Sequence, residues 1–262
     1  MLVDSHCHLD YPQLYEQLDD VLKRAEKAGI GRIVTISTQI GHVEHYKALA
    51  EHHKQIFFTI GTHPHSAAEE PDIPVSAIAA HTNHPRCIGI GEAGLDYHYD
   101  FAPRDIQQKV FRTHIAAARE TGLPLVVHAR EADDDMISIF REEMEQGAFM
   151  ALLHCFSSTE KLAEAGIDLG FYFSFSGILT YKKADEVRRL ASMIPNDRVL
   201  VETDAPYLAP VPFRSKTNEP SYIVHTARVL ADIKGVSEQD IADITTDNFY
   251  RLFQKAARED KR

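Results

Sequence analysis

The chain has 262 residues, of which 44% are hydrophobic and 26% are charged. This composition is ordinary for a globular protein with a buried core. The length matches the roughly 250 residues of a typical (β/α)8 barrel, although two smaller domains would also fit. The formal net charge of −11 excludes a protein that binds nucleic acid through its whole surface, because such binding neutralises many phosphates with basic residues. A phosphate-containing substrate would need local positive charge.

Two further features of the composition bear on cellular location. No apolar run approaches the ~18 residues that a membrane span needs, and no signal-peptide pattern precedes the first motif. The cysteines Cys7, Cys87 and Cys155 are too few and too scattered for a disulfide framework. We therefore expect a cytoplasmic protein with reduced thiols and no membrane partner. The acidic surface, without an evident apolar helix, suggests a monomer.

Short apolar runs alternate with longer amphipathic stretches along the chain. The amphipathic stretches include 18–29, 104–122, 132–147 and 182–194, and the tail from 221 to 260 predicts two further helices. The eight apolar runs, each a predicted strand, span 2–4, 32–37, 56–60, 87–91, 123–127, 150–153, 171–175 and 198–202. Eight strands alternating with helices favour a parallel sheet that closes into a barrel. Because no linker or repeat interrupts the pattern, we predict one α/β domain over residues 1–262, a single (β/α)8 TIM barrel.

The chain opens MLVDSHCHLDYP, with two histidines placed two apart directly after the first apolar run. Side chains alternate along a strand, so His6 and His8 point to the same side, and Cys7 points toward the helices. An HxH motif alone is weak evidence for a metal, because a histidine at a strand end is often a hydrogen-bonded core residue. The evidence for a metal becomes stronger when the residues at the ends of the other predicted strands are considered.

Histidines and carboxylates follow or end most of the predicted strands. In a barrel these positions surround the carboxyl-terminal end of the strands, where active sites form. Independent structural explanations for every one of them are implausible, and four histidines with two carboxylates suit Zn, Mn, Ni or Mg. We predict two divalent ions of undetermined identity, which would give an acidic protein a cationic centre for an anionic phosphodiester. The predicted metal ligands are His6, His8, Glu92, His128, His154 and Asp204, and His63 follows another of these strands.

The motifs DSHCHLD, GTHPH, GEAGLDY, VVHARE, LHCFS, FYFSFSGILTYK and VETDAPYLAP resemble the TatD family of metal-dependent deoxyribonucleases, within the amidohydrolase-like metal hydrolases. The resemblance runs from residue 4 to about 250 and implies DNA as substrate, as single strands or at ends. It implies one ion held by His6, His8, Glu92 and Asp204, and a second held by Glu92, His128 and His154. It also implies three catalytic residues, Asp204, Glu92 and His63, with Asp204 orienting or deprotonating the attacking water and His63 beside the scissile phosphate.

Three positions depart from the usual pattern of that family. Ser215, in the loop FRSKTNEP, stands where glycine is usual, Ser158 stands where glycine is common, and Ala129 stands where serine is common. None of the three is a predicted metal ligand. They bear on contacts with nucleic acid, and they leave substrate preference open.

The predicted chemistry is metal-assisted hydrolysis of a phosphodiester. A bound ion lowers the pKa of its water from about 16 toward about 7, and Asp204 is placed to accept the proton. Glu202 lies two residues before Asp204 and shares its face. Glu202 either orients a ligand or is the buried partner of a lysine or arginine.

Five residues on the loops after the strands are candidates for contacts with a nucleic acid. Basic side chains there could bind phosphates, although for each of them solvation or an ordinary ion pair is the favoured explanation. Aromatic side chains there either offer a face for a stacked base or pack beneath their loop. The basic candidates are Arg130, Arg214 and Lys216, and the aromatic candidates are Tyr97 and Tyr99.

Two other functions fit the same set of residues. A metal-activated hydroxide attacks carbon as readily as phosphorus, so a metal-dependent amidohydrolase or lactonase acting on a small carbonyl substrate is the main alternative. A non-catalytic binding module that holds metals for structure is the other. Enclosed ions would favour that module, whereas an ion with an open coordination position would favour an enzyme.

Overall fold

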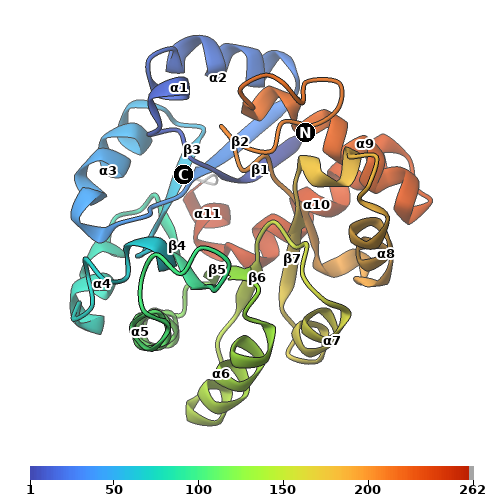
Figure 1. Cartoon of the computed structure of the whole chain (residues 1–262). Helices are drawn as coiled ribbons and strands as arrows, with labels where there is room; N and C mark the ends of the chain where they lie inside the picture. Colours follow the sequence, from blue (N-terminus) through green and yellow to red (C-terminus); the bar gives the residue numbers. More distant parts are fainter. Residues whose placement is uncertain (260–262) are drawn as a thin grey trace. The chain divides into compact units, whose positions relative to one another are not determined.

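The computed structural model describes residues 1–259, and Figure 1 shows its helices and strands, most of them labelled. The sheet has eight strands, and their order in it follows the chain from β1 to β8. Parallel strands that alternate with helices in this order define the (β/α)8 barrel, so the predicted fold class is confirmed. Contacts within the chain define two compact units with four strands each. The expectation of a single domain over residues 1–262 stays a prediction.

The first unit comprises residues 1–35, 155–157 and 172–251. Its strands are parallel neighbours, β7 with β8 and β1 with β2. The hydroxyl of Ser5 on β1 donates a hydrogen bond of 2.9 Å to the carbonyl of Val201 on β8, which joins the two pairs. Its elements are β1 (Leu2–Cys7), α1 (Pro12–Tyr15), α2 (Leu18–Lys27), β2 (Ile30–Thr35), β7 (Tyr172–Phe175), α8 (Asp185–Met193), β8 (Val199–Val201), α9 (Ile223–Lys234) and nearly all of α10 (Glu238–Leu252).

The second unit comprises residues 36–154 and 158–171, together with the described part of the tail from residue 252. Strands β3 to β6 are consecutive parallel neighbours, and their apolar runs are almost completely buried. Its elements are α3 (Val43–His52), β3 (Ile56–Ile60), α4 (Val75–His81), β4 (Cys87–Asp96), α5 (Arg104–Thr121), β5 (Leu125–Arg130), α6 (Asp133–Gln146), β6 (Ala151–Leu153), α7 (Glu160–Asp168) and α11 (Gln254–Glu259).

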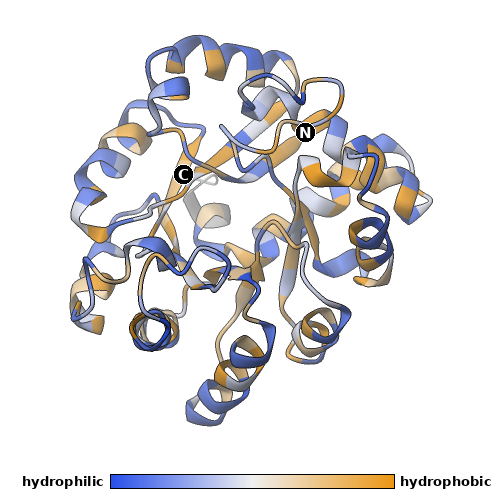
Figure 2. Ribbon diagram, viewed as in Figure 1, coloured by the Kyte–Doolittle hydropathy of each residue, from blue (hydrophilic) through white to orange (hydrophobic). Residues whose placement is uncertain are grey.

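Aromatic side chains fill the layer between helices and strands in the second unit. The ring of Phe140 on α6 packs edge-on against Phe171 at 5.0 Å and lies 5.9 Å from the ring of Phe111 on α5. All three side chains are fully buried, and burying one such ring stabilises the fold by about 2–3 kcal/mol. Figure 2 shows hydrophilic and hydrophobic residues together on α5 and α6, as expected of amphipathic helices with one buried face.

The observed elements differ from the predicted ones at two places that matter. Strand β4 continues to Asp96, five residues beyond the predicted end at 91, so Glu92 lies inside a strand and not at its end. The tail forms three helices, α9, α10 and α11, where we predicted two. The second predicted helix is interrupted at Phe253, which is fully buried, and residue 260 at its end lies outside the described residues. Across residues 1–259, no helix combines the length and the apolar character that crossing a bilayer demands.

Candidate metal centre

Two imidazoles and a carboxylate lie together in the first unit, where β1 and β8 end. His6 is the fifth residue of β1, His8 follows that strand, and Asp204 comes after β8. Oδ1 of Asp204 lies 3.7 Å from Nε2 of His6 and 3.5 Å from Nε2 of His8. Both histidines are buried, whereas the side chain of Asp204 is 16% exposed. A small molecule such as water can therefore reach this carboxylate.

The backbone around Asp204 is fixed by hydrogen bonds to β1. The N–H of Asp204 donates to the carbonyl of His6 at 2.9 Å. The preceding Thr203 donates both its N–H and its hydroxyl to the buried carboxyl of Asp4, at 2.9 and 2.6 Å. Burial raises the pKa of Asp4 to about 8. Asp204 itself has a φ of 55°, in the left-handed region that aspartate enters more readily than most residues.

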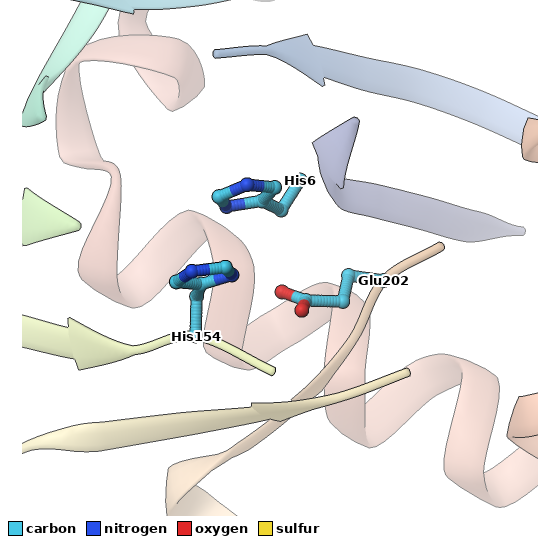
Figure 3. A group of neighbouring side chains, drawn as sticks. All are labelled: His6, His154 and Glu202. Atoms are coloured by element: carbon cyan, nitrogen blue, oxygen red, sulfur yellow. The ribbon is translucent and has the colours of Figure 1, made fainter. Parts of the chain in front are cut away.

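Glu202 is fully buried beside this group. Its Oε2 accepts a hydrogen bond from the hydroxyl of Ser174 on β7. Glu202 and His6 each offer a ligand atom, and these two atoms lie within 4.8 Å of one another. Figure 3 shows the two side chains, one from β1 and the other from the segment after β8. A carboxylate held by a neutral hydroxyl next to an imidazole is suited to orienting that imidazole.

A second group surrounds Glu92 in the second unit. Oε1 of this carboxylate lies 2.7 Å from Nε2 of His154, 2.8 Å from Nδ1 of His128 and 3.4 Å from Nε2 of His63. The four side chains come from the consecutive strands β3 to β6 or from the segments that follow them. His154, which follows β6, is drawn in Figure 3. Glu92 is 1% exposed. Three imidazole nitrogens thus lie close to the same buried carboxylate oxygen.

Both groups have the donor atoms and the spacing that a divalent ion requires. The ligand atoms of His63, Glu92 and His128 all lie within 4.8 Å of one another, as do those of His6 and His8. Imidazole nitrogen and carboxylate oxygen bind such ions at about 2.0–2.2 Å, so neighbouring ligand atoms in a tetrahedral site lie about 3.4 Å apart. Small side-chain movements would suffice to admit an ion. This donor set suits Zn, Mn or Ni through imidazole and Mg through carboxylate.

The ring of His63 is largely buried, and its tautomer is set by the backbone of His65. Burial lowers the pKa of His63 to about 4, so the ring is neutral at pH 7. Its Nδ1 accepts a hydrogen bond of 3.1 Å from the N–H of His65, which places the proton of the neutral ring on Nε2. A protonated Nε2 donates a hydrogen bond and does not bind a metal. This tautomer fits a residue that contacts a substrate oxygen better than it fits a ligand.

Sequence reasoning missed Asp96, the last residue of β4. This carboxylate is fully buried, and its Oδ2 lies 2.8 Å from Nε2 of His65 and 3.2 Å from Nε2 of His128. Burial raises its pKa, but the hydrogen bonds from the two imidazoles outweigh burial and hold the pKa of Asp96 well below its ordinary value. The available signal was its spacing, because a residue four positions after Glu92 in a strand shares its face.

The candidates for nucleic-acid contacts separate into packed and accessible side chains. The hydroxyl of Tyr97 donates to Asp135 at 2.7 Å, and Arg104 lies over the Tyr97 ring at 4.2 Å, so packing is the correct alternative for Tyr97. Tyr99 is 48% exposed, and Arg130 lies over its ring at 4.8 Å.

In the first unit, the loop that carries Arg214, Ser215 and Lys216 is exposed. The guanidinium of Arg214 lies over the Tyr181 ring at 3.6 Å, and Nζ of Lys216 lies 5.5 Å from the centre of the Phe213 ring. Neither contact removes the positive charge, so both side chains can still bind a phosphate. In the second unit, Ser158 donates to Asp133 at 2.6 Å.

Residues 3–254 match the family described as TatD related DNase. The chain belongs to the TatD family. The Bacillus subtilis (strain 168) protein named metal-dependent hydrolase YabD is 39% identical over 254 residues, which cover 97% of this chain and 99% of that protein. The Escherichia coli (strain K12) protein named metal-dependent hydrolase YcfH is 40% identical over 256 residues, which cover 96% and 95%. The resemblance seen in the motifs is confirmed, and this TatD-family chain is a metal-dependent hydrolase.

A solved structure agrees with this assignment. The crystal structure of YJJV, a TatD homolog from Escherichia coli K12, matches this fold with a TM-score of 0.89 at 26% sequence identity. The match covers 97% of this chain and 98% of that one. The TatD-family fold therefore extends over nearly the whole chain.

Proposed function

We propose that this TatD-family hydrolase cleaves phosphodiester bonds of DNA, as single strands or at ends, with two divalent ions bound. The observation that carries the proposal is the meeting of three imidazole nitrogens within 3.4 Å of one oxygen of Glu92. The family description as a DNase supports the choice of substrate. Cytoplasmic residence and a monomeric state stay predictions.

We assign the six ligands in two groups, each within one unit. In the first unit His6, His8 and Asp204 are ligands, supported by the contacts of both imidazoles with Oδ1 of Asp204. In the second unit Glu92, His128 and His154 are ligands, supported by the contacts of both imidazoles with Oε1 of Glu92. When bound, the ions supply a nucleophilic water near neutral pH and neutralise charge on the phosphoryl oxygens.

Asp204 and His63 act directly on water and substrate in this proposal. Asp204 accepts the proton of the attacking water, because its carboxylate is accessible and its backbone is fixed against β1. His63 donates its Nε2–H to a phosphoryl oxygen, which its neutral tautomer allows at pH 7. Glu202 and Asp96 orient histidines through hydrogen bonds or close contact and do not touch the substrate.

An assay of purified protein with several substrate classes tests this function. The protein, supplied with Mg or Mn, is incubated with single-stranded DNA and, separately, with a panel of amides and lactones. We expect DNA to be cleaved and the panel to be left intact. The Asp204→Asn protein, purified in parallel, controls for contaminating nucleases. Turnover of the panel with intact DNA would make the chain an amidohydrolase or lactonase, and inertness toward every substrate would favour a binding module.

A further inference from the structure

Two exposed aromatic rings lie against each other in the loop between β4 and α5. Phe101 is 65% exposed and Tyr99 is 48% exposed, which makes Phe101 the most exposed large apolar side chain in residues 1–256. The two rings are stacked, with centres 5.2 Å apart and planes inclined by 10°. Exposed apolar surface that is bordered by polar residues is typical of a ligand-binding surface.

Asp96 holds this ring pair in place. Its Oδ1 accepts hydrogen bonds of 3.0 Å from the N–H groups of His98 and Tyr99. Its Oδ2 holds Nε2 of His65, whose ring lies edge-on against Tyr99 at 5.5 Å and against Phe101 at 4.8 Å. The rings are therefore ordered before any ligand arrives, and a ligand that stacks on them does not have to order the loop.

The ring pair adjoins the group around Glu92. The ring of His65 lies 4.3 Å from that of His63 and 6.2 Å from that of His128. One side chain therefore separates the exposed aromatic surface from a residue assigned to the substrate and from a proposed metal ligand. If the reacting phosphate of a substrate lay beside His63, the nucleotide next to that phosphate would lie close enough to contact Phe101.

Charges around the rings favour an anionic ligand. Arg130, at the end of β5, lies over the ring of Tyr99 at 4.8 Å. The nearby carboxylate of Asp100 is paired with Arg104 at 2.8 Å, and that of Glu131 lies 2.6 Å from Nδ1 of His98. The positive charge of Arg130 thus stands beside the aromatic surface, and each of these two carboxylates has its own partner.

We propose that Tyr99 and Phe101 form a stacking platform for an unpaired nucleobase of the strand that is cut, and that Arg130 binds a phosphate of the same strand. The proposal rests on the proposed function and names its substrate more narrowly. Stacking on aromatic rings accepts any base and does not depend on a basic surface, which suits a chain with a net charge of −11. A base within a duplex is already stacked, so the platform selects single strands and frayed ends.

Two oligonucleotides that differ at a single nucleotide test the platform. One carries a normal base next to the cleaved bond, and the other carries an abasic sugar there. For the unmodified protein we expect a KM about 10-fold lower for the normal strand, because base–aromatic stacking has about that effect. In Phe101→Ala this ratio falls toward one, and in Phe101→Trp it is kept. Met150→Ala removes another exposed apolar side chain, 44% exposed and located before β6, and keeps the ratio.

Several results would overturn the platform. Equal KM values of the unmodified protein for the two strands would do so, as would a ratio that Phe101→Ala leaves unchanged. If sedimentation shows a dimer that Phe101→Ala dissociates, the ring pair belongs to an interface with a second copy. Fluorescence anisotropy with the Asp204→Asn protein measures binding of both strands without cleavage. If the Asp204→Asn protein binds both strands with equal affinity, the platform is refuted. If it prefers the normal strand but the unmodified protein cleaves neither strand, only the proposed reaction is refuted.

Discussion

Asp96 and His128 form a hydrogen bond on the side of the imidazole that faces away from Glu92. Nε2 of His128 lies 3.2 Å from Oδ2 of Asp96, and its Nδ1 lies 2.8 Å from Oε1 of Glu92. Burial lowers the pKa of His128, but these two carboxylates outweigh burial and raise it above its ordinary value. A carboxylate behind the imidazole of a metal-binding histidine orients the ring. We propose that Asp96 has this role for His128.

We expect Asp96→Asn to weaken binding of a divalent ion by about 10- to 100-fold, because the amide no longer fixes the ring of His128 as a carboxylate does. Isothermal titration of the metal-free protein with Zn or Mn measures the affinity directly. Asp100→Asn is the matched control, since that carboxylate is exposed and pairs with Arg104. Equal affinities in both variants would show that Asp96 serves only the fold.

Asp204→Asn should lower kcat by at least about 100-fold and leave the melting temperature nearly unchanged. The amide cannot accept the proton from water, whereas the backbone hydrogen bond to His6 does not involve the side chain. Steady-state kinetics together with thermal melting separate the two effects. Turnover close to that of the unmodified protein would exclude this carboxylate as the base.

Removal of metal should abolish hydrolysis, and addition of Mg, Mn or another divalent ion should restore it. Because the ligands come together only in the folded chain, an ion at 100 times its Kd should also stabilise the fold by about 2.7 kcal/mol. Activity and melting temperature are followed through cycles of chelation and metal addition. Hydrolysis that survives thorough chelation would contradict the two-metal proposal.

His114 on α5 should make stability fall in acid. Its ring is buried, with Nε2 accepting the N–H of Thr62 at 3.0 Å and Nδ1 2.8 Å from the carbonyl of Val110. Burial lowers its pKa from 6.5 to about 4. Between these values the unfolded chain binds a proton that the folded chain does not. The free energy of unfolding is therefore not reduced by His114 above pH 6.5, and it falls by about 3 kcal/mol as the pH drops to 4.

Urea unfolding of His114→Gln at pH 7 and pH 4.5 tests this pH dependence. We expect the variant to be less stable at pH 7 but to lose less stability on acidification than the unmodified protein does. His42→Gln is the control, because that histidine is exposed and should leave the pH dependence unchanged. The same acid-induced loss in His114→Gln would assign the effect to other groups.

Gly94→Ala should damage both the fold and the site. A Cβ on Gly94, which has a φ of 155°, would lie 1.9 Å from the carbonyl oxygen of His128. The two strands must then separate next to a proposed ligand, at a cost of about 3 kcal/mol and most of the activity. In Gly122→Ala, where nothing lies within 4 Å and φ is 68°, we expect a loss of about 1 kcal/mol and normal turnover. Denaturant unfolding and kinetics of both variants make the comparison.

The sequence by itself determined the strands and the types of side chain at their ends. Short apolar runs separated by amphipathic stretches are local patterns, so the runs at 56–60 and 87–91 could be read as strands without knowing their neighbours. The alternation of side chains is equally local, which is why His6 and His8 could be placed on one side. Nothing in the sequence showed that β4 extends beyond residue 91, or that the tail is interrupted at Phe253.

Only the tertiary structure decided which of these residues meet. Asp96 contacts His65 and His128, which lie 31 and 32 positions away, and no local pattern records contacts over such distances. The choice between Tyr97 and Tyr99 as an accessible ring also depended on Asp135, a residue of α6. Burial and hydrogen bonding are set by the neighbours that the folded backbone provides, and those neighbours are distant in the chain.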